Sequence, residues 1–290
     1  MSNSTVPTQS GLGRRGPTEA VVRERERETV AVVIPTYNVG DIIRRCLDAV
    51  KWADEIIVVD MFSDDDTLKV CDEYPNARVY QRKDYIFANV NFGMDQATSD
   101  WTIRLDSDEV VSLELAESIR KVLRSPRAGI NGYYFPSIQR IFGEPMRYGV
   151  GLPELNKRKC MFRAGTARYE CKFEHEDISA QGPFDVLDGN YEHFTNATVS
   201  EFIRKMNYYT DKDTERLADS ELKPSPPLRV WYRAIRMFIL YYFQWRGYRD
   251  GYLGFYSSLM RGPLYVFATE AKRWEAWRDR SRSNHPGDSK

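Results

Sequence analysis

Two carboxylates one residue apart are the side chains best suited to chemistry in this sequence. Asp106 and Asp108 lie in the segment Leu105–Glu109, at the end of a short apolar run. In a loop both carboxylates can turn to one side, and Mg²⁺ or Mn²⁺ typically binds one or two protein carboxylates together with substrate phosphates. The pair therefore indicates a divalent-cation site for a diphosphate ligand, although the same spacing also occurs in turns and helix caps.

Two other apolar runs also end in polar residues. Pro35–Asn38 follows the run Thr29–Ile34, and Asp60 ends a second run. The loop after Asp60 carries three acids, Asp64–Asp66, which are more typical of helix capping than of a binding site. If these runs are neighbouring parallel strands, their ends bring polar groups from three strands to one crevice.

The elements that must position these residues alternate between strands and helices. Apolar runs predict strands over 29–34, 55–60, 77–81 and 101–105, and amphipathic periodicity predicts helices over 40–50, 67–74, 88–97 and 112–124. Alternation of this kind implies right-handed crossovers, and so an α/β fold with an open, mostly parallel sheet flanked by helices.

The pattern changes after residue 131. Segments over 132–135 and 169–179 read as strands interrupted by Gly and Pro, and we expect them to form an antiparallel addition that covers the site. A capping box, Thr198–Glu201, then opens a long helix through about residue 217. We expect a disordered tail over 1–28, a catalytic domain over 29–195 and a helical region over 196–290.

Composition restricts the class of protein. The formal net charge is zero, which argues against a globally basic nucleic-acid binder. The four cysteines include no Cys-x-x-Cys pair, which argues against a zinc ribbon and a disulfide scaffold. Because no apolar leader follows Met1, we expect a reducing, cytoplasmic compartment.

The C-terminal segment 229–282 departs from this neutrality. It holds eleven Lys or Arg, four Asp or Glu and fifteen of the 38 aromatic residues. Rings beside cations are typical of a helix that lies at a membrane surface, and no run reaches the roughly 20 apolar residues needed to span a bilayer. We expect a peripheral location on the inner face of the cell membrane, with an aromatic helical layer packed on the catalytic domain as the alternative.

Taken in order, these motifs resemble a family. Val33–Asn38, Asp54–Asp60 and Asn91–Glu109 are similar to GT-A type inverting nucleotide-sugar glycosyltransferases of family 2, in particular those of lipopolysaccharide-core and related glycan assembly. Weaker similarity extends to about residue 270. The resemblance implies a GT-A Rossmann-like sheet, Mn²⁺ or Mg²⁺ as cofactor, a nucleoside-diphosphate sugar as donor, with a UDP-sugar favoured, and a lipid-linked or lipopolysaccharide-type glycan as acceptor.

The resemblance also implies roles for individual residues. The donor and nucleotide would lie against Pro35, Tyr37, Asp60, Asp106 and Arg163, and the metal against Asp106, Asp108 and His193. The base that deprotonates the acceptor hydroxyl would be Glu176 or Asp177. On a strand these two point to opposite faces, so only one of them can reach the acceptor.

Three alternatives remain open at this point. The basic cluster Lys157–Lys159 with Arg163 holds either a phosphate or only solvent. A nucleotidyltransferase also uses acidic metal ligands on an α/β sheet, but it typically needs a basic, Gly-rich loop after the first strand, and 35–41 contains no Lys or Arg. A non-catalytic scaffold that binds membrane or glycan would keep the same fold.

Overall fold

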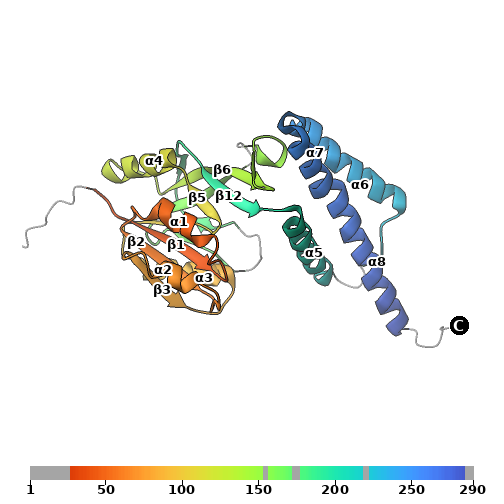
Figure 1. Cartoon of the computed structure of the whole chain (residues 1–290), viewed down its shortest axis with the longest axis horizontal. Helices are drawn as coiled ribbons and strands as arrows, with labels where there is room; N and C mark the ends of the chain where they lie inside the picture. Colours follow the sequence, from red (N-terminus) through yellow and green to blue (C-terminus); the bar gives the residue numbers. More distant parts are fainter. Residues whose placement is uncertain (1–26, 153–155, 172–176, 218–221, 285–290) are drawn as a thin grey trace, which may run out of the picture.

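A computed structural model describes residues 27–152, 156–171, 177–217 and 222–284 (Figure 1). The strands are β1 Val30–Thr36, β2 Glu55–Asp60, β3 Ala77–Gln81, β4 Trp101–Arg104, β5 Glu109–Val111, β6 Gly132–Ile141, β7 Glu144–Met146, β8 Lys157–Arg163, β9 Ala167–Arg168, β10 Ser179–Ala180, β11 Phe184–Val186 and β12 Tyr191–Asn196. The helices are α1 Ile43–Val50, α2 Thr67–Cys71, α3 Ile86–Gln96, α4 Leu113–Arg124, α5 Val199–Glu215, α6 Pro227–Ile239, α7 Gly251–Leu259 and α8 Tyr265–Asn284. Short 3₁₀ turns lie at η1 Gly149–Gly151 and η4 Gly247–Asp250, and π-helical turns at η3 Leu240–Gln244 and η5 Met260–Leu264.

Ten strands of the described residues form one sheet. Its main path runs β3-β2-β1-β4-β8-β6-β12-β5, and β7 and β11 pair with β6. The first four strands are parallel, whereas β8 runs antiparallel to both β4 and β6. The chain leaves β1 toward β2 on one side and returns to β4 on the other, which creates a switch point where α/β sheets bind ligands. The expected α/β fold is confirmed.

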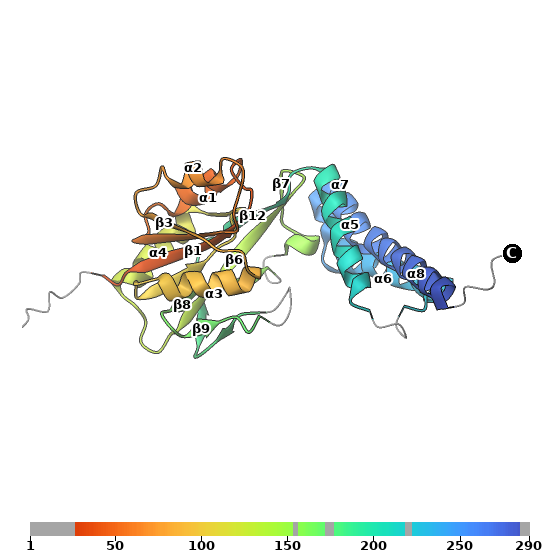
Figure 2. The same cartoon turned by 90° about the horizontal axis from the view of Figure 1, so that it is seen from below.

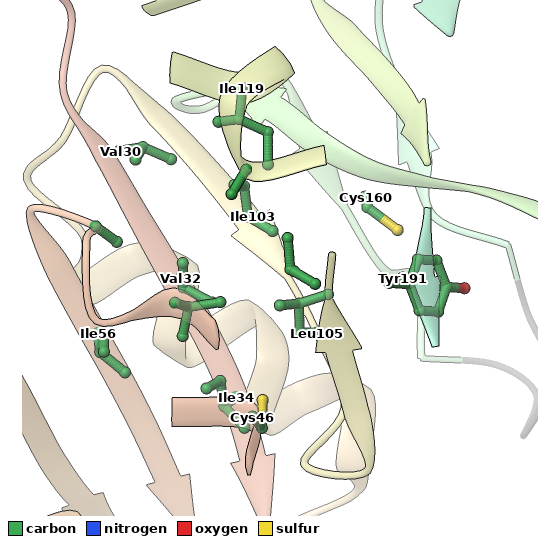
Figure 3. Packing of buried hydrophobic residues seen from close by; sticks show 14 of the residues in the cluster. Val30, Val32, Ile34, Cys46, Ile56, Ile103, Leu105, Ile119, Cys160 and Tyr191 are labelled. Atoms are coloured by element: carbon green, nitrogen blue, oxygen red, sulfur yellow. The ribbon is translucent and has the colours of Figure 1, made fainter. Parts of the chain in front are cut away.

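Alternation along β1 divides the core into two faces. Val30, Val32 and Ile34 point to the face covered by α1, α2 and α4 (Figure 3), whereas Ala31 and Val33 point toward α3. Figure 2 shows α1 and α2 on one side of the sheet and α3 on the other. All seven residues of β1 are buried, as expected for a strand covered on both sides. This two-sided cover holds the strand ends rigidly in place.

The strand expected over 169–179 is wrong in its described part, where a strand begins only at Ser179. Tyr169 instead packs into the core, stacked on Phe87 with ring centroids 4.2 Å apart. Its backbone N–H donates to Asn91 Oδ1 and its carbonyl accepts from Asn91 Nδ2, both at 2.9 Å. The amide side chain therefore satisfies the backbone groups that a neighbouring strand would otherwise satisfy.

The C-terminal helices form a second body beside the sheet (Figure 1). Thr198 and Glu201 make the expected capping box: Glu201 N donates to Thr198 Oγ1 at 3.1 Å, and Ala197 N donates to Glu201 Oε2 at 2.9 Å. The two bodies join where Asp250 Oδ2 accepts the backbone N–H groups of Arg147 and Tyr148. Over the described ranges, the helices are too short or too polar to cross a bilayer.

Candidate active site

The loop between β4 and β5 presents the two carboxylates predicted from the sequence. Leu105 is fully buried and anchors its start. Asp106 N donates to Glu109 Oε2 at 2.9 Å, and Glu109 N donates to the Asp106 carbonyl at 3.0 Å. Glu109, itself fully buried, therefore closes a tight turn that sets the directions of Asp106 and Asp108.

Asp106 is held by two arginines. Arg104 Nη2 donates to Asp106 Oδ1 at 2.7 Å, and Arg158 Nη1 donates to Oδ2 at 3.3 Å. Arg158 Nη2 also donates to Glu109 Oε2 at 2.6 Å. Burial by itself raises the pKa of the Asp106 carboxyl, but the charges of Arg104 and Arg158 outweigh it and hold that pKa below its ordinary value. Asp106 is therefore ionised, with both oxygens already engaged.

Asp108 has a different partner. β12 pairs with β5 so that His193 lies opposite Glu109, and Phe194 N donates to the Asp108 carbonyl at 3.0 Å. His193 Nε2 then lies 3.4 Å from Asp108 Oδ1. Burial by itself lowers the pKa of His193, but the hydrogen bond and charge of Asp108 outweigh it, so the pKa is raised.

The donor set suits a divalent cation only in part. Among the described residues, three or more His, Cys, Asp or Glu side chains do not gather at one point. Asp108 and His193 supply an oxygen and a nitrogen side by side, and each is about a quarter exposed. Mg²⁺ and Mn²⁺ accept few protein ligands when substrate phosphates and water complete the shell. The pair therefore fits a metal that binds together with a diphosphate.

These groups open into a cavity of about 1400 Å³ between the sheet and the C-terminal helices. Pro35 and Tyr37 line it from the end of β1, and Tyr37 is 55% exposed. Asp106, Asp108 and His193 line the same wall. With Asp177, which also lines it, the structure brings six of the predicted site residues to one cavity.

Asp60 lies elsewhere. It is fully buried, and its oxygens accept hydrogen bonds from Ser63 N at 2.9 Å, Ser63 Oγ at 2.5 Å and Gln81 Nε2 at 3.3 Å. In this arrangement Asp60 braces the loop after β2 instead of facing the cavity. Asp65 braces the neighbouring loop, since its Oδ2 accepts from Gly40 N and its Oδ1 from Thr67 N. Asp65 therefore caps the first N–H of α2, as expected from this acidic run, and also ties that helix to the loop after β1.

Arg163 is not brought to the cavity. It pairs with Trp101 at the amino end of β4, the end opposite Asp106. Its guanidinium lies 4.6 Å from the Trp101 ring centroid and 3.2 Å from Glu28 Oε1. Glu28 and Arg27, assigned from sequence to the tail, thus contact the catalytic domain, where Arg27 pairs with Asp54 at 2.7 Å.

Of the two candidates for the base, the structure describes only Asp177. Asp177 lines the cavity, and its Oδ2 lies 3.1 Å from Lys159 Nζ. Its side chain is 71% exposed, so this ion pair is a weak constraint on its position. Glu176 lies outside the described residues.

Sequence reasoning missed Arg104, Arg158 and Glu109. Arg104 carried a signal, because a charged residue inside an otherwise apolar strand is buried only when it is paired. Arg158 was one of four cations in a cluster, and only the pairing of β8 with its neighbours separates it from Arg163. The signal from Glu109 was weaker, since an acid after Asp-x-Asp reads as a continuation of a solvated loop.

Known proteins with similar sequences include bacterial glycosyltransferases. The chain is 25% identical over 258 residues to the lipopolysaccharide core biosynthesis glycosyltransferase LpsC of Rhizobium meliloti (strain 1021), covering 83% of this chain and 90% of that protein. It is 22% identical over 249 residues to an uncharacterized glycosyltransferase of Rickettsia prowazekii (strain Madrid E), covering 82% and 83%.

A solved structure and a family model complete the comparison. TarS 1–349 of S. aureus in complex with UDP has a TM-score of 0.43 at 14% identity, covering 89% of this chain and 92% of that one. Residues 31–179, just over half of the chain, match the model of glycosyl transferase family 2, and they include all of β1 but its first residue, β4 and the Asp106–Asp108 loop. This chain therefore belongs to glycosyl transferase family 2.

Proposed function

We propose that this family 2 glycosyltransferase moves a sugar, with inversion, from a nucleoside-diphosphate sugar to a hydroxyl of a lipid-linked or lipopolysaccharide-type glycan. A UDP-sugar is the favoured donor. The observation that carries the proposal is the placement of Asp108 beside His193 at the end of β4, in the cavity that Pro35 and Tyr37 also line.

The reaction needs two sets of groups in the cavity: one that binds the donor and its metal, and one that removes a proton from the acceptor. In this proposal Tyr37 stacks on the donor base. Asp106, which Arg104 and Arg158 hold in place, accepts hydrogen bonds from the ribose. Asp108 and His193 would hold the Mn²⁺ or Mg²⁺, which neutralises charge on the departing diphosphate. Inversion requires the acceptor oxygen to attack from the opposite side, so a separate base must remove its proton.

We assign that base to Glu176 or Asp177. Asp177 lines the cavity, and general-base catalysis by a positioned carboxylate typically contributes about 10²–10⁴ in rate. Asp177→Asn and Glu176→Gln, measured separately, assign the role: the variant that loses turnover while it still binds nucleotide and metal identifies the base.

The acceptor assignment draws on the outer face of the C-terminal region. Exposed apolar residues follow one stripe along α6 and η3: Leu228, Trp231, Tyr232, Ile235, Ile239 and Phe243. Arg229 and Arg236 flank this stripe on α6. A stripe of this kind suits the interface of a membrane with anionic headgroups. We propose that it holds the enzyme on the inner face of the cell membrane, where a lipid-linked acceptor is available.

The test is calorimetric titration with UDP, GDP and TDP, with and without Mn²⁺. We expect one nucleotide to bind only with metal, and Asp108→Asn to lose that binding and to lower turnover by roughly 10²–10³. Asp66→Asn, which changes an exposed carboxylate outside the cavity lining, is the matched control. If the folded protein binds none of the nucleotides, the non-catalytic scaffold becomes the better reading.

A further inference from the structure

The helical wall of the cavity is positively charged. It carries Lys205 from α5, Arg233 and Arg236 from α6, and Arg261 from η5, against one acid, Glu201. This wall faces the Asp106–Asp108 loop from the other body of the molecule, so its charge is separate from that of the donor site.

Two of these four cations are neutralised within the wall. Lys205 Nζ lies 3.2 Å from Glu201 Oε1, and Arg233 Nη1 lies 2.5 Å from Glu270 Oε1. The Lys205 pair lies within α5, and the Arg233 pair joins α6 to α8. The other two cations of the wall are Arg236 and Arg261.

Arg261 is half-buried, and one nitrogen of its guanidinium has no partner among the described residues. Its Nε is inaccessible to solvent and has no hydrogen-bond partner in the described part of the chain. Its guanidinium carbon lies 5.8 Å from the centroid of the Phe202 ring. Burial lowers the pKa of Arg261, and the neighbouring Tyr241 offsets this only in part. A half-buried cation of this kind is costly unless an anion meets it.

The fold holds Arg261 in place. It sits in the π-helical turn η5, which contains Pro263 and therefore lacks one backbone donor. Gly262 packs against the backbone of α6, where an added Cβ would lie 3.3 Å from the Met237 carbonyl carbon. Arg236 lines the same cavity from α6, and across the described ranges it has neither a carboxylate within salt-bridge distance nor a hydrogen bond from its side chain.

We propose that Arg236 and Arg261 form a subsite for a phosphate group of the acceptor. The proposal rests on the function proposed above. A phosphomonoester carries a charge of about −1.5 to −2 at neutral pH, which the charges of two guanidinium groups offset. A carboxylate ligand, with a single negative charge, would offset only one of them. Guanidinium groups also bind phosphate oxygens in pairs of parallel hydrogen bonds. The phosphate belongs either to a phosphorylated sugar of the glycan or to the lipid that carries it.

The test titrates inorganic phosphate into the protein saturated with UDP and Mn²⁺. We expect phosphate to bind, and Arg236→Ala/Arg261→Met to weaken that binding about tenfold or more. Arg229→Ala removes an exposed arginine of the same helix that does not line the cavity, and we expect no change. Arg261→Lys keeps the charge and should retain part of the binding, which separates charge from packing. Circular dichroism checks that each variant folds.

Two results would overturn the subsite. In the first, phosphate does not bind to the protein saturated with UDP and Mn²⁺, or the double variant no longer binds UDP. Either outcome would assign the two arginines to the donor site. In the other, phosphate binding is the same in the double variant. If UDP never binds but phosphate binding still depends on the two arginines, the subsite stands and the proposed function fails. Glucose 6-phosphate and vesicles containing phosphatidic acid, compared in the same variants, distinguish the two sources.

Discussion

Asp106 and Asp108 stand two residues apart and have different surroundings. Asp106 lies between Arg104 and Arg158, and both of its oxygens accept hydrogen bonds. Asp108 lies beside His193. Because the negative charge of Asp106 is already offset by two guanidinium groups, its oxygens are weaker metal ligands than those of Asp108. The arrangement therefore favours a ribose contact for Asp106 and a metal contact for Asp108. The two acids of one motif therefore support different tasks.

At this scale the pair of Arg158 and Glu109 sets the stability of the site. Glu109 is fully buried, so Arg158→Met leaves its carboxylate without its cation and should cost about 3–5 kcal/mol of unfolding free energy. The double change Arg158→Met/Glu109→Gln should recover part of that loss, because the buried charge is removed. Urea unfolding of the native protein and both variants measures this; equal losses in the two variants would contradict it.

Among the elements, α6 carries both residues that line the cavity and exposed apolar residues. Arg233, Arg236 and Met237 line the cavity, and the exposed apolar stripe runs beside them along the same helix. The spacing of the stripe, three or four residues apart, keeps it on one face of the helix.

If the stripe binds a membrane, Leu228→Ser/Ile235→Ser should weaken binding to phosphatidylglycerol vesicles by about tenfold or more, because both side chains would be buried in lipid. Leu228 is 84% and Ile235 53% exposed. Leu113→Ser is the control, since Leu113 is 85% exposed on α4. Co-sedimentation measures the binding. Unchanged binding, together with a dimer that dissociates in the double variant, would assign the stripe to a second copy of the chain.

The same region has a pH-dependent link between helices. Glu270 on α8 accepts from Ser225 N and Ser225 Oγ at 3.2 Å and pairs with Arg233 and Arg273. Burial alone raises the pKa of Glu270, but the Ser225 N–H and the two arginines outweigh it, so the pKa lies below its ordinary value of 4.5.

Because the folded pKa is depressed, the stabilisation is full above pH 4.5 and is lost as the pH falls through the folded value. Glu270→Gln should therefore lower the unfolding midpoint at pH 7, and its difference from the native protein should shrink below about pH 4.5. Glu275→Gln, on an exposed position of the same helix, should show no such dependence. Urea unfolding between pH 3 and pH 7 measures both. A difference that stays constant with pH would contradict the assignment.

At the scale of the whole molecule, the cavity exists only because two bodies meet. The sheet supplies the wall that carries Asp106 and Asp108, and the helices supply the cationic wall. Asp250 joins them through the N–H groups of Arg147 and Tyr148 at 3.1 and 2.7 Å, and Gly149 N donates to the Trp245 carbonyl at 2.7 Å.

Removing that link should separate binding from turnover. Asp250→Ala removes the partner of two backbone donors, of which the Tyr148 N–H is partly buried, at a cost of about 1 kcal/mol. We expect nucleotide binding with Mn²⁺ to remain, since its groups lie on the sheet, and transfer to the acceptor to fall. Asp188→Ala, a change on the catalytic domain away from the junction, is the control. Equal losses of nucleotide binding and transfer would contradict this division.

The sequence by itself determined the parallel half of the sheet, the Asp-x-Asp loop and the capping box of α5. Each depends on local pattern: a β-branched run buried on both faces, two acids at the end of a strand, and a Thr three residues before a Glu. These signals lie within a few residues of the structure they specify, so the chain carries them without reference to its fold.

Tertiary structure decided which charges meet. Arg158 and Arg163 lie five residues apart on β8, yet Arg158 contacts Asp106 and Glu109 while Arg163 contacts Glu28 at the other end of the sheet. The buried position of Asp60 and the place of Arg261 in the cavity lining likewise depend on tertiary packing. The partner of a long, charged side chain depends on strand register and on how separate elements pack, and neither is encoded in neighbouring residues.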